Sequence, residues 1–284
     1  MQKLKSKVLD KLIASHVTST ELNLLLYISH YQFDRGNVMG IYYRDVCAAI
    51  DVSYQAFYDA LKGLQEKNII MAQKGSYYDW DVLILDNDFS NVEANSESYI
   101  STGHDLFHSH DFYALKANEK LLAMHMIKVS GANKGRYCIS VKNLYSIFTK
   151  MLCVTKRAIQ NYLKNLKKFF LIGIRDNKYW ITPRKKVYKA NAPTDKKLFS
   201  QGIAKTVLRR NRVKNAPETF TDTVSLVAQY YKDYGSRLQE CFSKAFEKSL
   251  YCRNERQSNK YKWNRNISPA FVHKLLRKEL GIEC

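Results

Sequence analysis

Two stretches of the sequence decide the fold: residues 52–70, VSYQAFYDALKGLQEKNII, and residues 154–172, VTKRAIQNYLKNLKKFFLI. In the first stretch, Ser53 precedes apolar residues with the i, i+1, i+4, i+5, i+8 spacing of a helix that buries one face: Ala56, Phe57, Ala60, Leu61 and Leu64. The β-branched pair Ile69-Ile70 follows and predicts a strand. The second stretch repeats this order of a capped helix followed by a strand.

The two stretches belong to a longer internal repeat. Upstream, residues 20–28 align with residues 118–126 at an offset of 98, and this offset still relates Ile41 to Ile139. From Ile50 and Leu152 onward the offset is 102, and this alignment pairs Ile69-Ile70 with Leu171-Ile172. The difference of four residues is about one helical turn. We therefore expect one helix of the second copy to be longer by a turn.

Each copy is predicted to contain a helix, a short strand, two helices and a hairpin. Thr20 and Asn118 are the predicted N-caps of the two first helices. In the first copy the expected elements are helices 20–31, 44–50 and 53–67 and strands 41–43, 69–72 and 80–85, with a polar tip at 73–78. In the second copy they are helices 118–129, 141–152 and 155–169 and strands 137–141, 171–174 and 179–182, with a tip at 175–178.

Both quoted stretches resemble the helix-turn-helix and first wing strand of winged-helix DNA-binding domains. The resemblance covers about residues 15–88 and 112–184, and two such units in one chain are similar in layout to plasmid replication initiators. It implies a fold that is mainly α with small β wings (α+β). It also implies that the third helix of each copy enters the major groove of DNA, where base edges present distinguishable donors and acceptors.

The resulting organisation has four parts. Winged-helix domain 1 covers residues 1–88, an acidic linker covers 89–111, winged-helix domain 2 covers 112–184, and a basic helical region covers 185–284. The linker is inferred because residues 86–111 contain six acids and neither Lys nor Arg. The net charge of the chain is +20, and residues 184–284 contribute +14 of it (23 Lys+Arg and 9 Asp+Glu). Such an excess of cations indicates a polyanionic partner.

Residues off the buried face of each third helix, together with the wing, are the candidate DNA contacts. In the second copy these are Lys156, Arg157, Gln160, Asn161 and Lys164, with Arg175, Asn177 and Lys178 on the wing. Arginine can bind guanine through two hydrogen bonds, and Gln or Asn can bind adenine in the same way. In the first copy they are Tyr54, Gln55, Tyr58 and Lys62, with Lys74 on the wing. That face is less basic and more aromatic, so the second copy is expected to hold DNA more strongly.

In the C-terminal region, helices are expected at 199–213, 222–255 and 268–280. The cations Arg209, Arg210 and Arg212 are candidates for neutralising phosphates. A later stretch, residues 251–265, interleaves Arg253, Arg256, Lys260, Lys262 and Arg265 with aromatic residues and could do the same. Alternatively this region forms a homodimer or binds a partner protein through its apolar positions, although such positions more often form a local core.

Other classes of protein are disfavoured. The six cysteines form no CxxC pair, and the chain shows no P-loop, GxGxxG or HExxH motif. The segment HDLFHSHD (104–111) reads as exposed histidines rather than a metal site. We expect no enzymatic activity, no cofactor and no metal. No stretch approaches the roughly 18 consecutive apolar residues of a membrane span, so we expect no membrane and a cytoplasmic, nucleoid-associated location.

The sequence thus predicts a sequence-specific double-stranded DNA-binding protein that acts by occupancy, as a transcriptional regulator. A plasmid or phage replication initiator uses the same physics and is the first alternative. A non-enzymatic adaptor or segregation protein, with one winged helix contacting protein, is the second. RNA or single-strand binding is the third, and it is favoured if the tyrosine- and tryptophan-rich C-terminal region dominates affinity.

Overall fold

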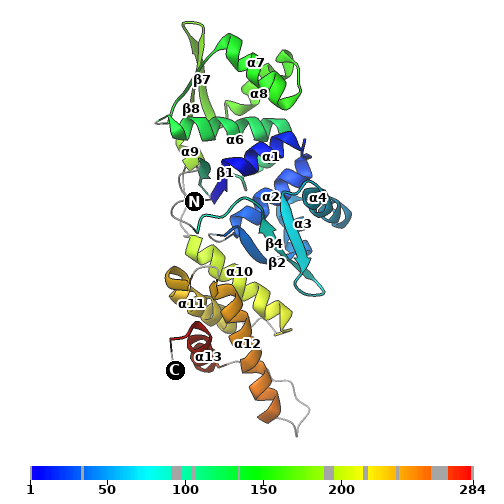
Figure 1. Cartoon of the computed structure of the whole chain (residues 1–284), viewed down its shortest axis with the longest axis vertical. Helices are drawn as coiled ribbons and strands as arrows, with labels where there is room; N and C mark the ends of the chain where they lie inside the picture. The colour runs from blue at the N-terminus through cyan, green and yellow to red at the C-terminus, as the bar shows by residue number, and fades with distance from the viewer. Residues whose placement is uncertain are drawn as a thin grey trace.

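The three parts of the protein follow one another along its long axis (Figure 1), with the second copy at one end, the first copy in the middle and the C-terminal helices at the other end. The structure, a computed structural model, describes residues 2–32, 35–90, 98–103, 106–133, 135–188, 195–213, 217–234, 237–256 and 268–282. Over these residues the chain is mainly helical with small antiparallel sheets, which confirms the expected α+β class.

The first copy consists of three helices and a three-stranded sheet. Its elements are α2 (Ser19–His30), β2 (Asn37–Tyr42), α3 (Tyr43–Ile50), α4 (Tyr54–Glu66), β3 (Ile70–Lys74) and β4 (Asp79–Ile84). The sheet is antiparallel with the order β2-β4-β3. The α4 helix begins as predicted, because the Ser53 hydroxyl accepts a hydrogen bond from the Ala56 N–H at 3.2 Å. Its predicted apolar face is buried at Phe57, Leu61 and Leu64.

The second copy has the same element order and the same strand order, β6-β8-β7. Its elements are α6 (Ala117–Ala132), β6 (Tyr137–Ser140), α7 (Val141–Leu152), α8 (Lys156–Leu166), β7 (Phe170–Arg175) and β8 (Lys178–Pro183). The α7 helix has 12 residues and α3 has 8. Both end at a left-handed residue, Asp51 (φ 51°) and Cys153 (φ 52°). The extra turn predicted from the change of offset is therefore confirmed and lies in α7.

The first helix of each copy starts earlier than predicted. The N-cap of α2 is Thr18, whose hydroxyl accepts the Glu21 N–H while the Glu21 carboxylate accepts the Thr18 N–H. Glu119 accepts the Lys116 N–H in the same way at 2.8 Å. An acid in such a capping box occupies the third helical position and does not follow the cap directly. The predicted caps at Thr20 and Asn118 were therefore wrong by two residues.

The predicted alignment of the first hairpin strands of the two copies was wrong by two residues. The Leu85 N–H donates to the Ile69 carbonyl, and the Arg184 N–H donates to the Phe169 carbonyl, so Phe169 occupies the place of Ile69. Phe169 and Phe170 are buried like Ile69-Ile70, whereas Leu171 is 54% exposed. The α8 helix has 11 residues and α4 has 13, so the strand after α8 begins two residues earlier than the constant offset of 102 anticipated.

The segment predicted as an acidic linker contributes to the core instead. Its strand β5 (Tyr99–Thr102) pairs antiparallel with the unpredicted strand β1 (Gln2–Lys5), which leads into α1 (Ser6–Ala14). A short helix, α5 (His110–Tyr113), follows. Ile100, Phe107 and Phe112 are each 1% exposed, and they belong to one continuous apolar core that spans both copies. The linker prediction therefore fails for the described residues 98–103 and 106–111.

A buried lysine lies where the two copies meet. Lys120 of α6 is 0% exposed, and its ammonium donates to the Ser19 hydroxyl (3.1 Å) and to the Tyr113 carbonyl (3.0 Å). Burial lowers the pKa of Lys120 from 10.5 to about 8, against the opposing effect of the Glu119 carboxylate. The repeat places Leu22 of the first copy at the equivalent position, and Leu22 is also fully buried.

The C-terminal helices form a second core. After α9 (Lys185–Tyr188) these are α10 (Asp195–Arg210), α11 (Pro217–Tyr234), α12 (Arg237–Arg256) and α13 (Pro269–Leu280). The helix predicted at 222–255 is thus two helices, while the predicted start at Ser268-Pro269 is confirmed. The apolar positions considered for a partner surface face one another within this core, where Val227, Leu238, Phe242 and Phe246 are at most 1% exposed. No helix among the described residues combines the length and the apolar character needed to cross a bilayer.

Candidate nucleic-acid interface

The exposed face of α8 carries the polar residues predicted to read DNA. Lys156, Arg157, Gln160, Asn161 and Lys164 are all exposed. The opposite face is anchored in the core, where Ile159, Leu163 and Leu166 are at most 5% exposed. Thr155 caps the helix by accepting the Ala158 N–H at 3.3 Å. Within the described part of the chain, the side chains of Arg157, Gln160, Asn161 and Lys164 form no hydrogen bond or ion pair, so their donors and acceptors remain available to a ligand.

One contact ties the start of α8 to the adjoining sheet. The Lys156 ammonium lies 4.9 Å from the centre of the Tyr145 ring, and the Tyr145 hydroxyl is 2.8 Å from the Tyr179 hydroxyl of β8. Burial, with a contribution from this hydrogen bond, raises the pKa of Tyr179 to about 12. Tyr179 is therefore neutral at physiological pH, and the two tyrosines hold the first turn of α8 against the base of the hairpin.

The β7-β8 hairpin ends in a tight, exposed turn. Its two central residues, Asp176 (φ 51°) and Asn177 (φ 56°), are both left-handed, as in the type I′ turns favoured by two-residue hairpins. Arg175, Asn177 and Lys178 are exposed, as predicted for a wing. Arg175 pairs with Asp176 at 3.4 Å, but both side chains are at least 80% exposed, so this pair is weak. The tip therefore presents two cations to solvent.

The corresponding polar residues of α4 are engaged within the first copy. The Gln55 side chain donates to Asp59 at 2.8 Å, and the Lys62 ammonium lies 3.6 Å from the Glu66 carboxylate. Both pairs are exposed, so competition from a ligand requires little energy. The face is nevertheless less basic than that of α8, because each of these pairs contains an acid.

Aromatic side chains cover the rest of the α4 face. The rings of Tyr54 and Tyr58 have centroids 4.6 Å apart, Tyr43 stands edge-on to Tyr54 at 5.0 Å, and Trp80 lies 6.2 Å beyond Tyr58. The Lys74 ammonium lies 5.8 Å from the Trp80 ring. Of the predicted contacts of the first copy, Tyr54, Tyr58 and Lys74 thus belong to one connected aromatic row, and Tyr54 at 56% is the most exposed tyrosine within it.

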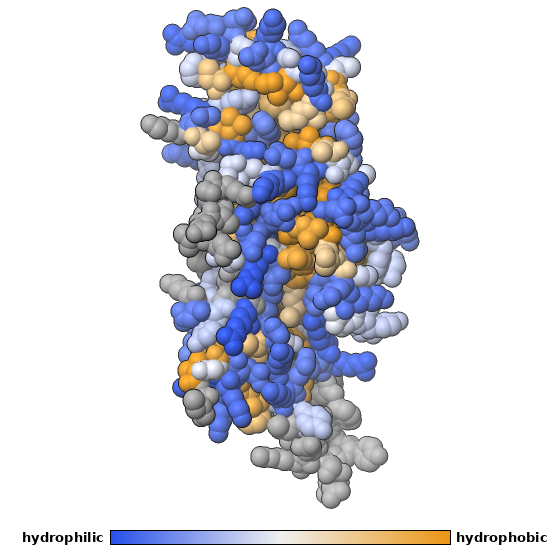
Figure 2. All heavy atoms as spheres, viewed as in Figure 1, coloured by the Kyte–Doolittle hydropathy of each residue, from blue (hydrophilic) through white to orange (hydrophobic). Residues whose placement is uncertain are grey.

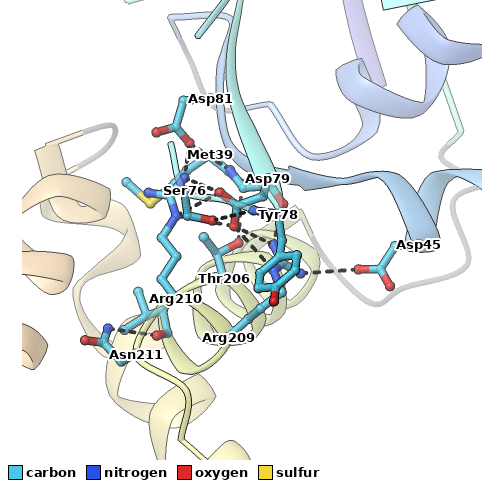
Figure 3. A network of polar contacts seen from close by, with 12 residues as sticks. Met39, Asp45, Ser76, Tyr78, Asp79, Asp81, Thr206, Arg209, Arg210 and Asn211 are labelled. Carbon is cyan, nitrogen blue, oxygen red and sulfur yellow. Dashed lines mark hydrogen bonds and ion pairs between the residues drawn. The ribbon is translucent and has the colours of Figure 1, made fainter. Parts of the chain in front are cut away.

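The cations Arg209 and Arg210, predicted to neutralise phosphates, are largely buried in contacts with the first copy. Both guanidinium groups bind the buried carboxylate of Asp79, with shortest distances of 3.0 and 2.9 Å (Figure 3). Arg210 also pairs with Asp81 at 2.6 Å, and Arg209 donates to the Gly40 carbonyl at 2.7 Å. The two side chains are only 19% and 14% exposed. We correct the prediction for these two residues: they attach α10 to the first copy and are not free to neutralise phosphates.

Glycines make room for this attachment. A Cβ atom on Gly40 would lie 2.1 Å from the Thr206 hydroxyl of α10, and one on Gly75 would lie 1.9 Å from the Arg210 guanidinium. Arg209 also stacks on Tyr42, with its guanidinium carbon 4.6 Å from the ring centre. Gly40, Tyr42, Thr206 and Arg209 border a cavity of about 100 Å³ between β2 and α10. We call the group of Asp79, Asp81, Arg209 and Arg210 the arginine clamp.

Other predicted residues are exposed, outside the described set, or packed differently. Arg212 is exposed, directly after the arginine clamp. Residues 257–267, with Lys260, Lys262 and Arg265, lie outside the described residues, as do the side chains of Arg253 and Arg256. So do His104 and Asp105, whereas His108 packs against His30 and forms a hydrogen bond with the Tyr113 hydroxyl. The prediction of an exposed His108 was therefore wrong.

The described residues hold no group of three or more His, Cys, Asp or Glu side chains arranged to bind a metal ion.

Sequence reasoning missed one surface, the outer face of the sheet β6-β8-β7, where Trp180 is 43% exposed. The alternation of exposed and buried residues in KYWITP (178–183) is the signal that could have revealed this surface.

Compared with models of protein families, with curated proteins and with solved structures, the chain gives no match.

Proposed function

We propose that the protein is a sequence-specific double-stranded DNA-binding protein with two winged helices, and that it acts by occupancy as a transcriptional regulator. The observation that carries the proposal is the face of α8. Four polar side chains there, Arg157, Gln160, Asn161 and Lys164, are exposed and form no hydrogen bond or ion pair with the described residues, on a helix whose other side is fixed in the core. Helix-turn-helix proteins insert such a helix into the major groove.

The rest of the second copy supports this role. Arg175 and Lys178 at the hairpin tip supply positive charge beside α8, which suits contact with backbone phosphates while α8 reads base edges. The first copy has the same element order but an α4 face whose polar groups are already paired. We therefore assign specific reading to the second copy and an auxiliary contact to the first.

Selection of bound duplexes from a random library tests the proposal. We expect one preferred sequence, and affinity for it that falls steeply as salt rises from about 50 to 200 mM, because several counterions are released. Arg157→Ala should weaken binding to the selected site by roughly 1–3 kcal/mol and leave binding to random DNA nearly unchanged. The matched control is Gln55→Ala at the equivalent position of α4, which should change affinity by less than Arg157→Ala.

Three outcomes separate the alternatives. Several directly repeated sites next to an origin would favour a replication initiator, whereas single sites near promoters favour a regulator. Failure to select any duplex, together with a flat salt response, would overturn the proposal and leave the adaptor function. Equal losses for Arg157→Ala on selected and random DNA would demote Arg157 to a phosphate contact.

A further inference from the structure

The outer face of the sheet β6-β8-β7 is an exposed apolar surface bordered by cations. Side chains alternate along β7 and β8, so the inner face buries Phe170 and Ile181 while the outer face exposes Leu171 (54%) and Trp180 (43%). Figure 2 shows, on the side drawn, apolar residues crossing the second copy between hydrophilic borders. A single exposed apolar residue is ordinary, but an exposed indole next to an exposed leucine on one sheet face indicates a binding surface.

A hollow lies beside the indole. Gly173 of β7 is the direct cross-strand partner of Trp180, and a Cβ atom added to Gly173 would meet no atom within 4 Å. The hollow has a volume of about 450 Å³, and its lining includes Lys167 and Arg184. Arg184 donates to the Lys167 carbonyl at 3.1 Å, which holds its guanidinium at the edge of the hollow. The lining contains the exposed Trp180 ring, the buried Phe170 and two cations but no acid.

The equivalent surface of the first copy has the opposite charge. Ile41 pairs with Trp80, and the repeat-related Ile139 pairs with Tyr179, so Asp79 and Asp81 correspond to Lys178 and Trp180. In the first copy the two acids are bound by the arginine clamp. The second copy presents Lys178 instead, so its outer face favours an anion where the first copy binds arginines.

We propose that this hollow binds single-stranded DNA, with one unpaired base stacked on the Trp180 ring in the space left by Gly173. Lys167, Arg184 and Lys178 then neutralise the phosphates on either side of that base. Single-strand binding combines aromatic stacking platforms with a cationic rim in this way, and stacking needs a base whose face is not covered by its neighbours. A duplex does not offer such a face, so the inference goes beyond the reading of duplex DNA by α8.

The charge of the rim selects this occupant over a second copy of the chain. Two copies meeting through this face would bring Lys167, Lys178 and Arg184 against the same cations of the partner, which is unfavourable. A phosphate backbone has the complementary sign. The apolar ring and the cations are therefore explained together by one ligand that contains both bases and phosphates.

Fluorescence anisotropy of a labelled oligothymidine of about 15 nucleotides tests the proposal with the full chain at about 50 mM salt. Trp180→Ala should weaken binding about ten-fold, the size expected for the loss of one stacked base. Gly173→Val should weaken it comparably by filling the hollow, although a β-branched residue favours the strand and should not harm folding. The matched control is Met71→Ala, which truncates an even more exposed apolar residue (60%, against 43% for Trp180) on the outer face of the first copy and should leave binding unchanged.

The result that overturns the proposal is binding of oligothymidine by Gly173→Val and Trp180→Ala with the wild-type affinity, or no binding by the wild type. The same loss for Met71→Ala as for Trp180→Ala would also overturn it, because the effect would then not belong to the hollow. Duplex binding measured with the same samples is independent: the hollow stands if oligothymidine binding depends on Trp180 even where no duplex is selected, and α8 stands in the reverse case.

Discussion

The two copies have the same elements in the same order, yet the outer sheet face of the first copy contacts α10 and that of the second copy is exposed. In the first copy, Asp79 and Asp81 draw in Arg209 and Arg210, and α10 lies against β2. In the second copy, Lys178 and Trp180 occupy the equivalent positions and remain exposed. The sheet face that carries two acids thus binds the C-terminal helices through ion pairs, whereas the face that carries a lysine and a tryptophan at the same positions is exposed.

The comparison also separates what the two copies must share from what they can change. The buried inner positions are apolar in both, such as Phe57 and Ile159 on the third helices and Ile70 and Phe170 on the hairpins. Their outer faces and third-helix surfaces differ in charge and in internal pairing. One unit is therefore fixed to the C-terminal helices, and the other exposes its third-helix face and its outer sheet face.

The largest expected effect is the loss of the arginine clamp. Asp79→Asn keeps the shape of the side chain but leaves two largely buried guanidinium groups without their shared carboxylate. Removing one member of a buried ion pair typically destabilises by several kcal/mol, and we expect the free energy of unfolding to fall by about 3–4 kcal/mol. Denaturant unfolding measures this.

The control for Asp79→Asn is Asp176→Asn at the hairpin tip of the second copy. That carboxylate pairs with Arg175, but both side chains are at least 80% exposed. Exposed pairs contribute little, so no measurable change is expected. If both variants lose the same stability, the clamp does not distinguish the first copy from the second and the comparison fails.

The second prediction concerns the core position at which the copies differ, Lys120 against Leu22. Burial lowers the pKa of Lys120 to about 8 in the folded protein, while the unfolded chain keeps a value near 10.5. Between these values the unfolded state binds more protons, so the free energy of unfolding should rise as the pH increases from about 8 to 10. A shift of this size corresponds to about 3 kcal/mol.

Denaturant unfolding of the wild type and Lys120→Met at several pH values measures this contribution. Burial also raises the pKa values of Tyr27 and Tyr113, which act in the opposite direction at higher pH. These groups are common to both proteins, so the difference between the two curves isolates Lys120. If the free energy of unfolding varies with pH in the same way for both proteins, Lys120 has the same pKa in the folded and the unfolded chain, which contradicts the prediction.

Local signals in the sequence were sufficient for the repeat but not for the contacts between distant segments. Caps, apolar periodicity and the change of offset predicted α4, α7 and α8, because each depends on neighbours within a few turns. The exposed face of α8 followed from the same periodicity. The outer face of the second sheet carries its own alternation in residues 178–183, but this pattern alone does not indicate which face another segment covers.

The arginine clamp and the β1-β5 pair could not be predicted in this way. Arg209 and Asp79 are 130 residues apart, and each alone reads as an exposed charge. Lys120 lies on a helix that is buried on several sides, so periodicity gave no reason to single it out. In each case the missing information is which segment packs against which, and this depends on tertiary contacts that a single sequence does not encode locally.

The smallest effect concerns the glycine that lets α10 approach. Gly40→Ala should lower the free energy of unfolding by about 2 kcal/mol, because its Cβ would lie 2.1 Å from the Thr206 hydroxyl and its φ of +74° disfavours a side chain. Gly135→Ala is the matched control, since Gly135 has a φ of +82° but open space around it. Gly135→Ala should lower the free energy of unfolding by about 1 kcal/mol, the cost of a side chain at positive φ alone. Gly173→Ala should leave the free energy of unfolding unchanged, because Gly173 has neither a positive φ nor an atom within 4 Å of an added Cβ. An equal loss for Gly40→Ala and Gly135→Ala would mean that α10 does not press on β2, and that the first sheet face is as open as the second.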